Sequence, residues 1–335
     1  MNPFIAALPK AELHVHLEGT LEPELSFVLA QRNGIALDYT TPQALLAAYD
    51  FHDLPSFLSI YYSAMKVLRH EQDFFELTWN YLLKARQQHV LYAEMFFDPQ
   101  AHTSRGVAFE TVIGGIHRAQ ERAAAELGVH TQLIMCFLRD MSAESAMQTL
   151  EESLPFRSWL VGVGLDSDEK NNPPVKFAAV FRRARELGLK LTMHCDVNQD
   201  NTLAHISQCL HAIGVDRIDH GVNSLEDPQL CATIRERELG LTVCPISNRF
   251  VVQSLTATEI QRMLALGMRA TVNSDDPAYF RAYVNENLAA LYEVGGLTRD
   301  EIVQLVRNSF IVAWLDEATR TQYLSRLDAY VRHAA

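Results

Sequence analysis

Short apolar runs alternate along the chain with segments whose apolar residues recur every three or four positions. The runs are rich in β-branched residues and are closed by polar ones, which is typical of buried parallel strands. The intervening segments, such as 175–188 and 258–267, have the period of amphipathic helices and end at Gly. Eight runs predict eight strands, at 11–19, 90–99, 130–140, 160–168, 190–198, 216–222, 240–248 and 269–276.

Eight alternations of strand and helix favour an α/β fold, a parallel (β/α)8 TIM barrel, over an open sheet. A long insert separates the first two strands, and we expect it to cover one mouth of the barrel. Within it, the aromatic residues of 56–68 predict a buried helix face that could also wall a pocket. No linker rich in Pro, Gly or Ser interrupts the 335 residues, so we expect a single domain over 1–335.

Composition narrows the range of partners. The formal net charge is −12 and no run of Lys or Arg forms a basic face, so we expect no nucleic-acid partner. No signal-like leader and no stretch of 18 apolar residues are present, so we expect a cytoplasmic protein without a membrane partner. The oligomeric state stays open, and a homo-oligomer is one of the alternatives. The cysteines lack CxxC spacing and predict reduced core thiols, at positions 136, 195, 209, 231 and 244.

Polar residues with metal-binding chemistry close several of the predicted strands, where the catalytic groups of a barrel lie. They are His14 and His16 on the first strand, His194 on the fifth, His220 on the sixth, and Asp275 and Asp276 on the eighth. Residues two apart on a strand share a face, so His14 and His16 can point at one ion. Three imidazoles and one carboxylate suit Zn²⁺ and leave a position for water.

Each of these features alone has a simpler explanation. An isolated His-x-His is more often coincidental, a single strand-end histidine more often belongs to the core, and "SDDP" is also a common turn sequence. The set is more informative than its members, because independent accidents would not all fall at the ends of strands. We expect the remaining histidines considered to be solvated or part of the core: His52, His70, His89, His117, His205, His211 and His333.

The chain resembles, nearly end to end, the adenosine and adenine deaminase family of the amidohydrolase superfamily. The matching motifs are, in order, "PKAELHVHLEGTLEPEL", "EMFFDPQ", "VGLDSDE", "RIDHGV", "LTVCPISN" and "VNSDDPAYF". In detail, "HLEGTLEPEL", "FFDPQ" and "SDDPAYF" look more like the branch that acts on the free base adenine. In the branch that acts on the nucleoside, the residue matching Glu18 is usually Asp and helps to hold the ribose.

The resemblance implies a role for each matching residue. It implies that one Zn²⁺ per chain is bound and supplies hydroxide, with the ligands His14, His16, His194 and Asp275. It further implies that His220 deprotonates and orients the attacking water at C6 of the purine and that Asp276 hydrogen-bonds N7. Groups near Gly164 and Ser167 would fix the N3 edge of the ring, and Glu18 would help to wall the site.

The sequence departs from the family pattern after His194. There the family normally has Ala-Gly-Glu, and the glutamate protonates N1 of the purine; this chain has Cys195, Asp196 and Val197. If the strand persists, Asp196 shares the inward face of His194, and our hypothesis is that its carboxyl replaces the missing acid. The alternative is that Asp196 only supports the metal site as a hydrogen-bond acceptor, while the amides of Asn198 and Gln199 read the substrate.

Together, these residues and the resemblance imply a zinc-dependent hydrolytic deaminase of purine metabolism. Its substrate would be a 6-aminopurine base, either adenine or an adenine substituted at N6 or C8, which gives the 6-oxopurine and ammonia or an amine. Two alternatives stay open: an adenosine deaminase, and a metal-binding barrel that has lost deaminase activity. Glu18 disfavours the first, and the intact set of His220, Asp275 and Asp276 disfavours the second.

Overall fold

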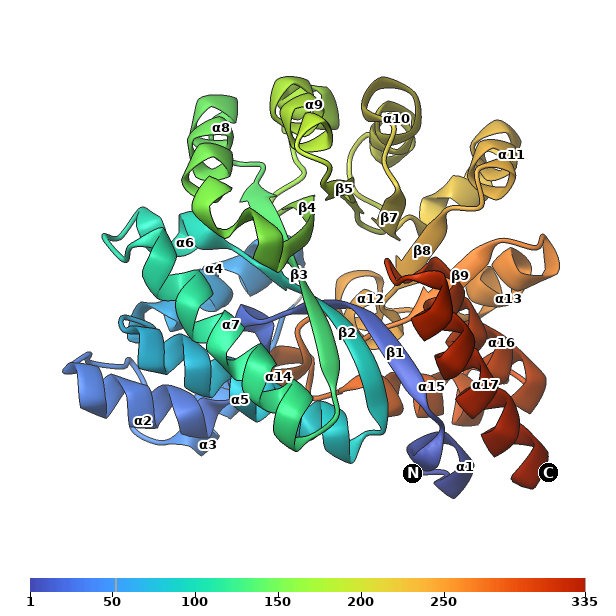
Figure 1. The fold of residues 1–335 in the computed structure, drawn as a ribbon, viewed down its shortest axis with the longest axis horizontal. Coiled ribbons are helices and arrows are strands. Elements are labelled where there is room, and N and C mark those ends of the chain that lie inside the picture. Colours follow the sequence, from blue (N-terminus) through green and yellow to red (C-terminus); the bar gives the residue numbers. More distant parts are fainter. Residues whose placement is uncertain (52, 335) are drawn as a thin grey trace.

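Parallel strands with helices on their outer side build the core of the molecule (Figure 1). The computed structural model describes residues 1–51 and 53–334. The strands are β1 (Lys10–His16), β2 (Val90–Phe97), β3 (His130–Leu138), β4 (Leu160–Asp166), β5 (Lys190–Leu191), β6 (His194–Cys195), β7 (Arg217–His220), β8 (Gly240–Val243) and β9 (Arg269–Val272). The predicted order of parallel strands and helices is therefore confirmed.

The α-helices occupy the predicted connections and both ends of the chain. They are α1 (Pro3–Ala7), α2 (Pro23–Asn33), α3 (Pro42–Ala47), α4 (Leu54–Ala64), α5 (Glu71–Gln87), α6 (Pro99–Thr103), α7 (Phe109–Glu126), α8 (Ala143–Glu152), α9 (Ala178–Glu186), α10 (Thr202–Ser207), α11 (Pro228–Glu236), α12 (Pro245–Val252), α13 (Ala257–Ala265), α14 (Pro277–Phe280), α15 (Val284–Glu293), α16 (Arg299–Val312) and α17 (Glu317–His333). None of those in the described residues has the length and apolar character that a membrane span needs.

The strands of the described residues form two arcs, one of five strands from β1 to β5 and one of four from β6 to β9. The arcs meet at two seams. At one seam, β1 and the end of the β9 strand region are joined by a bridge between Val15 and Asp275, with the Asp275 N–H donating to the His14 carbonyl at 3.1 Å. The arrangement is that of a TIM barrel whose hydrogen-bond ladder is interrupted at these seams.

The second seam lies within the predicted fifth strand, which is not continuous. The segment 190–198 forms only β5 and β6, and β5 pairs with β4 while β6 pairs with β7. The Asp219 N–H still donates to the Met193 carbonyl at 2.9 Å, so the chain between the two strands stays between its neighbours. Strand structure ends at Cys195, because a turn follows in which Asn198 has a left-handed φ of 56°. Asp196 therefore lies beyond the end of the strand. Its inward orientation was expected only if the strand continued through it, and the strand does not.

Two other strands are shorter than predicted. The run 240–248 is a strand only as far as Val243, because Pro245 occupies the first turn of α12 and ends the ladder. The run 269–276 is a strand only as far as Val272, and its polar end approaches β1 instead. The residues that follow these strands point toward the mouth of the barrel, where the polar side chains of the sequence gather.

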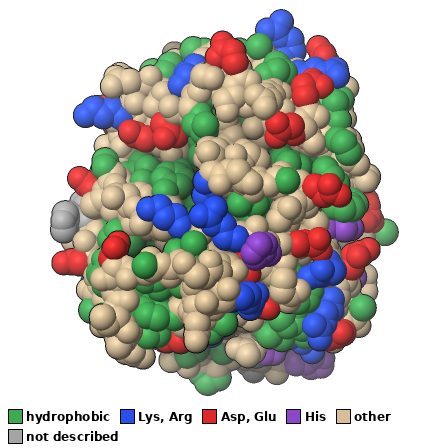
Figure 2. All heavy atoms as spheres, turned by 90° about the vertical axis from the view of Figure 1, so that its left-hand side faces the viewer, with side chains coloured by type: hydrophobic (Ala, Val, Ile, Leu, Met, Phe, Trp, Pro, Cys, Tyr) green, Lys and Arg blue, Asp and Glu red, His purple; other side chains and the backbone are tan. Residues whose placement is uncertain are grey.

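The insert between β1 and β2 covers that mouth, as predicted. Its helix α4 buries Phe57 and Tyr61 against Tyr279 and Phe280 of α14, so the segment 56–68 does form a buried aromatic face. Figure 2 shows the side of the molecule on the left of Figure 1: Lys and Arg gather near its middle and Asp and Glu lie around them. Acidic and basic side chains are therefore mixed on this face. The cysteines of the described residues form no disulfide bond.

Candidate functional site

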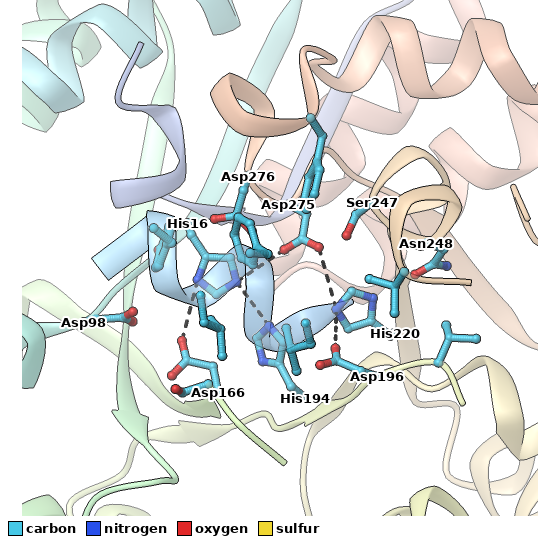
Figure 3. A pocket seen from close by; sticks show the side chains of 18 of the residues that line it. His16, Asp98, Asp166, His194, Asp196, His220, Ser247, Asn248, Asp275 and Asp276 are labelled. Carbon is cyan, nitrogen blue, oxygen red and sulfur yellow. Dashed lines mark hydrogen bonds and ion pairs between the residues drawn. The ribbon is translucent and has the colours of Figure 1, made fainter. Parts of the chain in front are cut away.

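Four side chains from three separated stretches converge at the mouth of the barrel. The Nε2 atom of His194 lies 3.1 Å from Nε2 of both His14 and His16. The Oδ1 atom of Asp275 lies 3.1 Å from Nε2 of His14 and 3.4 Å from Nε2 of His16. All four residues are buried, and Figure 3 shows the imidazoles of His16 and His194 turned toward one another beside Asp275. Sequence spacing anticipated this set, and the fold brings all of it together.

In His14 and His194, the hydrogen bond made by Nδ1 determines which ring nitrogen carries the hydrogen and which carries the lone pair. Nδ1 of His194 lies 3.2 Å from the carbonyl oxygen of Leu165, which can only accept, so Nδ1 carries the hydrogen. Nδ1 of His14 lies 2.9 Å from Oγ1 of Thr242, whose hydroxyl already donates to Asp219, so this nitrogen donates as well. The two Nε2 atoms therefore direct bare lone pairs at one point.

Lone pairs this close repel one another unless a cation lies between them. Zinc-to-nitrogen bonds of about 2.05 Å in a tetrahedron would place neighbouring ligand atoms roughly 3.3 Å apart. The measured separations of 3.1 to 3.4 Å match that size. Burial lowers the pKa of the His194 imidazole well below its ordinary value, which keeps it neutral and able to coordinate. The donor set therefore fits one small divalent metal ion.

Asp219 organises the metal-facing residues from behind, a role that the sequence analysis missed. Its carboxylate accepts hydrogen bonds from Thr192 Oγ1 at 2.6 Å and from Thr242 Oγ1 at 2.9 Å. It also lies 3.6 Å from Nδ1 of His194. Asp219 is fully buried, and as an acid within a predicted core strand it could have been recognised as a supporting group.

His220 and Asp196 form an ion pair beside the metal ligands. Nε2 of His220 lies 2.9 Å from Oδ1 of Asp196 and 3.9 Å from Oδ2 of Asp275. Burial alone would lower the pKa of His220, but the Asp196 carboxylate outweighs it and raises that pKa to about 9. Burial likewise opposes ionisation of Asp196, yet His220 lowers its pKa below the ordinary value. At rest the proton of this pair therefore belongs to His220.

The Asp196 backbone is anchored although it lies outside the strand. Its N–H donates to Oε1 of Glu169 at 2.5 Å, and the other oxygen of Glu169 lies 3.0 Å from Nδ1 of His205. His205, for which a core or solvated position was expected, is buried and takes part in this anchor. His52, another of the histidines in that group, lies outside the described residues. Asn198 instead pairs with the side chain of Asn223 at the surface, so the alternative in which Asn198 reads a substrate gains no support.

A cavity of about 600 Å³, counting its open mouth, lies against the metal-facing residues. Its polar lining comes from the ends of the strands and its apolar lining mostly from α4. The polar residues are His16, Asp98, Asp166, Ser167, His194, Asp196, His220, Ser247, Asn248, Asp275 and Asp276, and the remaining ones are Leu54, Phe57, Leu58, Tyr61, Tyr62, Val197, Val251 and Phe280. A cavity with an apolar wall on one side and convergent polar groups on the other is suited to a flat heteroaromatic ligand.

Asp276 and Ser167, two predicted substrate-binding residues, do line this cavity. Oδ1 of Asp276 has no hydrogen-bond partner among the described residues, and burial raises the pKa of this carboxyl well above its ordinary value. Burial and the neighbouring Asp275 carboxylate therefore favour the protonated form of Asp276, which can donate a hydrogen bond. Gly19 makes room for it, because a Cβ at that position would lie 2.1 Å from Asp276 Oδ1.

Glu18 and Gly164, the other two predicted substrate-binding residues, are not in the cavity wall. Oε1 of Glu18 accepts hydrogen bonds from the Asp98 N–H at 3.1 Å and from Nε2 of His102 at 2.8 Å. Gly164 lies within β4 opposite Cys136 of β3, where a Cβ would approach the Cys136 sulfur to 2.5 Å. Glu18 is buried behind the wall and Gly164 allows two strands to pack, so a role of either residue toward a substrate stays a prediction.

Two acids of the cavity wall were missed by the sequence analysis. Asp98 follows β2 and Asp166 ends β4, so both occupy the strand-end positions on which the other assignments were based. Oδ2 of Asp166 lies 3.6 Å from Nδ1 of His16, and burial raises the pKa of Asp166 to about 7. Their position at strand ends was the available indication, but the motifs that contain them were read only as marks of resemblance.

Comparison with known proteins agrees with this arrangement. The family model described as adenosine deaminase matches residues 9–330. An adenine deaminase of Geotalea uraniireducens is 48% identical over 336 residues, which cover 99% of this chain and 94% of that protein. The crystal structure of adenine deaminase from Arthrobacter aurescens superposes with a TM-score of 0.94 at 42% identity, covering 97% of this chain and 100% of that one.

A second solved structure is similar and contains a metal ion. It is an amidohydrolase from Burkholderia ambifaria with bound Zn, with a TM-score of 0.90 and 25% identity, covering 98% of this chain and 93% of that one. The resemblance that the sequence motifs suggested is therefore confirmed at the level of the family.

The convergence of lone pairs makes a direct prediction about metal content. The purified protein should contain close to one divalent ion per chain by elemental analysis, and His194→Ala should lose both the ion and the activity, because one corner of the tetrahedron is removed. His117→Ala is the matched control, because His117 stacks on Trp159 away from the site and should keep its ion. An active protein without metal would contradict the assignment.

Proposed function

We propose that this chain, which belongs to the adenosine deaminase family, is a zinc-dependent hydrolase that removes the 6-amino group of a free purine base, foremost adenine. The reaction consumes one water molecule and gives the 6-oxopurine and ammonia. The observation that carries this proposal is that the cluster of four metal-facing groups, three of which line the cavity, lies beside the His220–Asp196 pair and Asp276 in that same cavity. Hydrolysis at C6 of an aminopurine needs these three elements together.

Zinc is the ion that the site and the relatives best support. Three imidazole nitrogens and one carboxylate oxygen form a donor set of intermediate softness, for which zinc is well suited, and a water molecule would add as a fifth ligand. A similar structure with 25% identity carries bound Zn. When bound, the ion lowers the pKa of a water molecule toward neutrality and so supplies hydroxide for attack at C6.

His220 and Asp196 are placed to handle the proton of the attacking water. In this proposal His220, which carries the proton of the pair at rest, passes it from Nε2 across 2.9 Å to Oδ1 of Asp196 and then accepts a proton from the attacking water. Attack at C6 increases the electron density on N1, which takes the proton from Asp196. A second proton, taken from the attacking hydroxyl, leaves with the amino group as ammonia, so the residues end in their starting state.

The protonated Asp276 and the hydroxyl of Ser167 orient the ring in this proposal. A carboxylic acid that is neutral at pH 7 can donate to the N7 acceptor of the purine, which an ionised carboxylate cannot do. The hydroxyl of Tyr62 donates to Ser167 Oγ at 2.8 Å, which leaves the Ser167 hydroxyl hydrogen free to donate to the ring. These contacts would fix C6 beside the metal-facing residues.

Val197 favours a second group of substrates alongside adenine. It lines the cavity at the position where the family resemblance places the N1-protonating glutamate, and Leu58 and Val251 are also part of the cavity wall. Since N6 is attached to the carbon next to N1, an apolar substituent on N6 would meet apolar side chains rather than a carboxylate. We therefore include N6-alkyladenines in the proposal, with an amine as the leaving group.

The two other functions considered from the sequence have less support. A barrel without activity would have no need of a buried His220–Asp196 pair directed at the metal site, since such a pair is costly to bury. In the branch that acts on the nucleoside, the residue matching Glu18 helps to hold the ribose, and here Glu18 lies behind the cavity wall. The free base therefore remains the better-supported substrate.

The substrate proposal is tested by steady-state kinetics of the zinc-loaded protein. Adenine, N6-alkyladenines, 8-substituted adenines and adenosine are compared by kcat/KM, with ammonia or amine release as the readout. We expect a free base to exceed adenosine by at least about 100-fold, because a site built around an unsubstituted ring loses polar contacts when a sugar is attached. Faster turnover of adenosine than of every base would show that the substrate is wrongly assigned.

The proton route is tested with Asp196→Asn, which keeps size but cannot carry a proton. We expect kcat to fall by about 10² to 10⁴, the usual contribution of a positioned acid, while metal content stays near wild type. Asp200→Asn is the control, because Asp200 is an exposed acid of the same loop. A kcat within a few-fold of wild type would move the acid role elsewhere, and loss of the ion would indicate that Asp196 only supports the metal site.

A further inference from the structure

The cavity has a second polar end, away from His220, where buried carboxyl oxygens have no partner. Asp98 is 1% exposed and Asp166 is 3% exposed. Oδ1 of Asp98 and both Oδ atoms of Asp166 lack a hydrogen-bond partner within the part of the chain that the structure describes. Both residues line the cavity, and Figure 3 shows them on the opposite side of His194 from Asp196.

Unpartnered buried carboxyl oxygens are rare because leaving them without a donor is costly. Burial raises the pKa of Asp98 well above its ordinary value, so Asp98 and Asp166 can share one proton between them, and their other oxygens are left to accept a donor from a ligand in the cavity. The oxygens of Asp98 and Asp166 lie within 4.8 Å of one another and of a ring nitrogen of His16, so one small ligand edge can reach both. The chemistry that fits is a planar edge that carries an N–H group.

Asp98 is held in place by contacts behind the cavity. Its backbone N–H donates to Oε1 of Glu18 at 3.1 Å, and Nε2 of His102 lies 2.8 Å from the same oxygen. The guanidinium of Arg105 donates to Nδ1 of His102 at 2.6 Å, which leaves Nε2 as the donor to Glu18. The chain continues directly into α6 at Pro99, so the backbone of Asp98 is fixed on both sides.

The orientation of a bound base follows from the proposed function. If C6 and N1 face the His220–Asp196 pair, the opposite side of the purine, which carries N3 and N9, faces Asp98 and Asp166. A free base bears a ring N–H on that side. A nucleoside has none, because N9 carries the sugar.

We propose that Asp98 and Asp166 recognise the N3–N9 edge of a free purine base and thereby determine the preference for the base over the nucleoside. This inference rests on the proposed function for the orientation of the ring. It assigns Glu18 a positioning role: Glu18 acts on the substrate through Asp98 rather than by direct contact.

The edge contact is tested first through the ligand, without a variant. Calorimetry of the zinc-loaded protein compares hypoxanthine, the expected product from adenine, with 9-methylhypoxanthine, in which the N9 hydrogen is replaced. We expect hypoxanthine to bind about 10- to 100-fold more tightly, the range expected when a buried polar group is left without its hydrogen-bond partner. Product binding needs no turnover, so it is measured independently of activity.

Variants of Asp98 show whether the N9 methyl group weakens binding because a hydrogen bond to Asp98 is lost or because the methyl group does not fit the cavity. In Asp98→Ala, hypoxanthine should bind about 10-fold more weakly or worse, while 9-methylhypoxanthine stays within about 3-fold of wild type, because only the former loses a partner. Asp98→Asn keeps a carbonyl acceptor and should recover part of the affinity. Asp168→Asn is the control, since Asp168 is an acid next to Ser167 that does not line the cavity.

The outcomes distinguish this inference from the proposed function. Equal binding of both ligands by the wild type, or equal weakening of both in Asp98→Ala, would overturn the edge contact even if adenine is deaminated. Selective binding that depends on Asp98 supports it even if adenine is not deaminated, in which case only the reaction is wrongly assigned. If Asp98→Ala does not fold, the two ligands on the wild-type protein still decide the question.

Discussion

The convergence of electron pairs at one buried point is the constraint on which the rest of the site depends. Two imidazoles are held by acceptors behind them so that their Nε2 lone pairs face each other, and Asp275 adds negative charge to the same point. A fold would not bury this arrangement without a cation to balance it. The bridge that joins the two ends of the barrel is made by the backbone of Asp275, so the residue that links these strands also supplies a side chain to the site.

The sequence predicted most of this arrangement because strand geometry is regular. Residues two positions apart on a strand point to the same face, which placed His14 and His16 together. Parallel strands bring their carboxyl ends to one mouth of the barrel, which added His194 and Asp275. No knowledge of contacts across the barrel was needed for these four residues. His220 and Asp276 followed from the same rule, and both line the cavity.

The residues that were misplaced or missed depend on contacts that no local pattern encodes. Glu18 carries the expected chemistry, but its hydrogen bonds to Asp98 and His102, more than 75 positions away, hold it behind the wall. The strand at His194 ends early because of a turn, yet Asp196 still reaches the cavity since Glu169 holds its N–H. A sequence pattern indicates which side chains share a face of a strand. It does not indicate which residue, distant in the sequence, holds such a side chain in its final position.

The central claim, that a cation balances the convergent groups, is tested most directly by returning zinc to the chelated protein while following thermal unfolding. The account predicts that the unfolding temperature is markedly lower without metal, rises with added zinc and stops rising at one equivalent per chain, because the ion binds only the folded site. A chelated protein as stable as the zinc-loaded one, with no break at one equivalent, would contradict it.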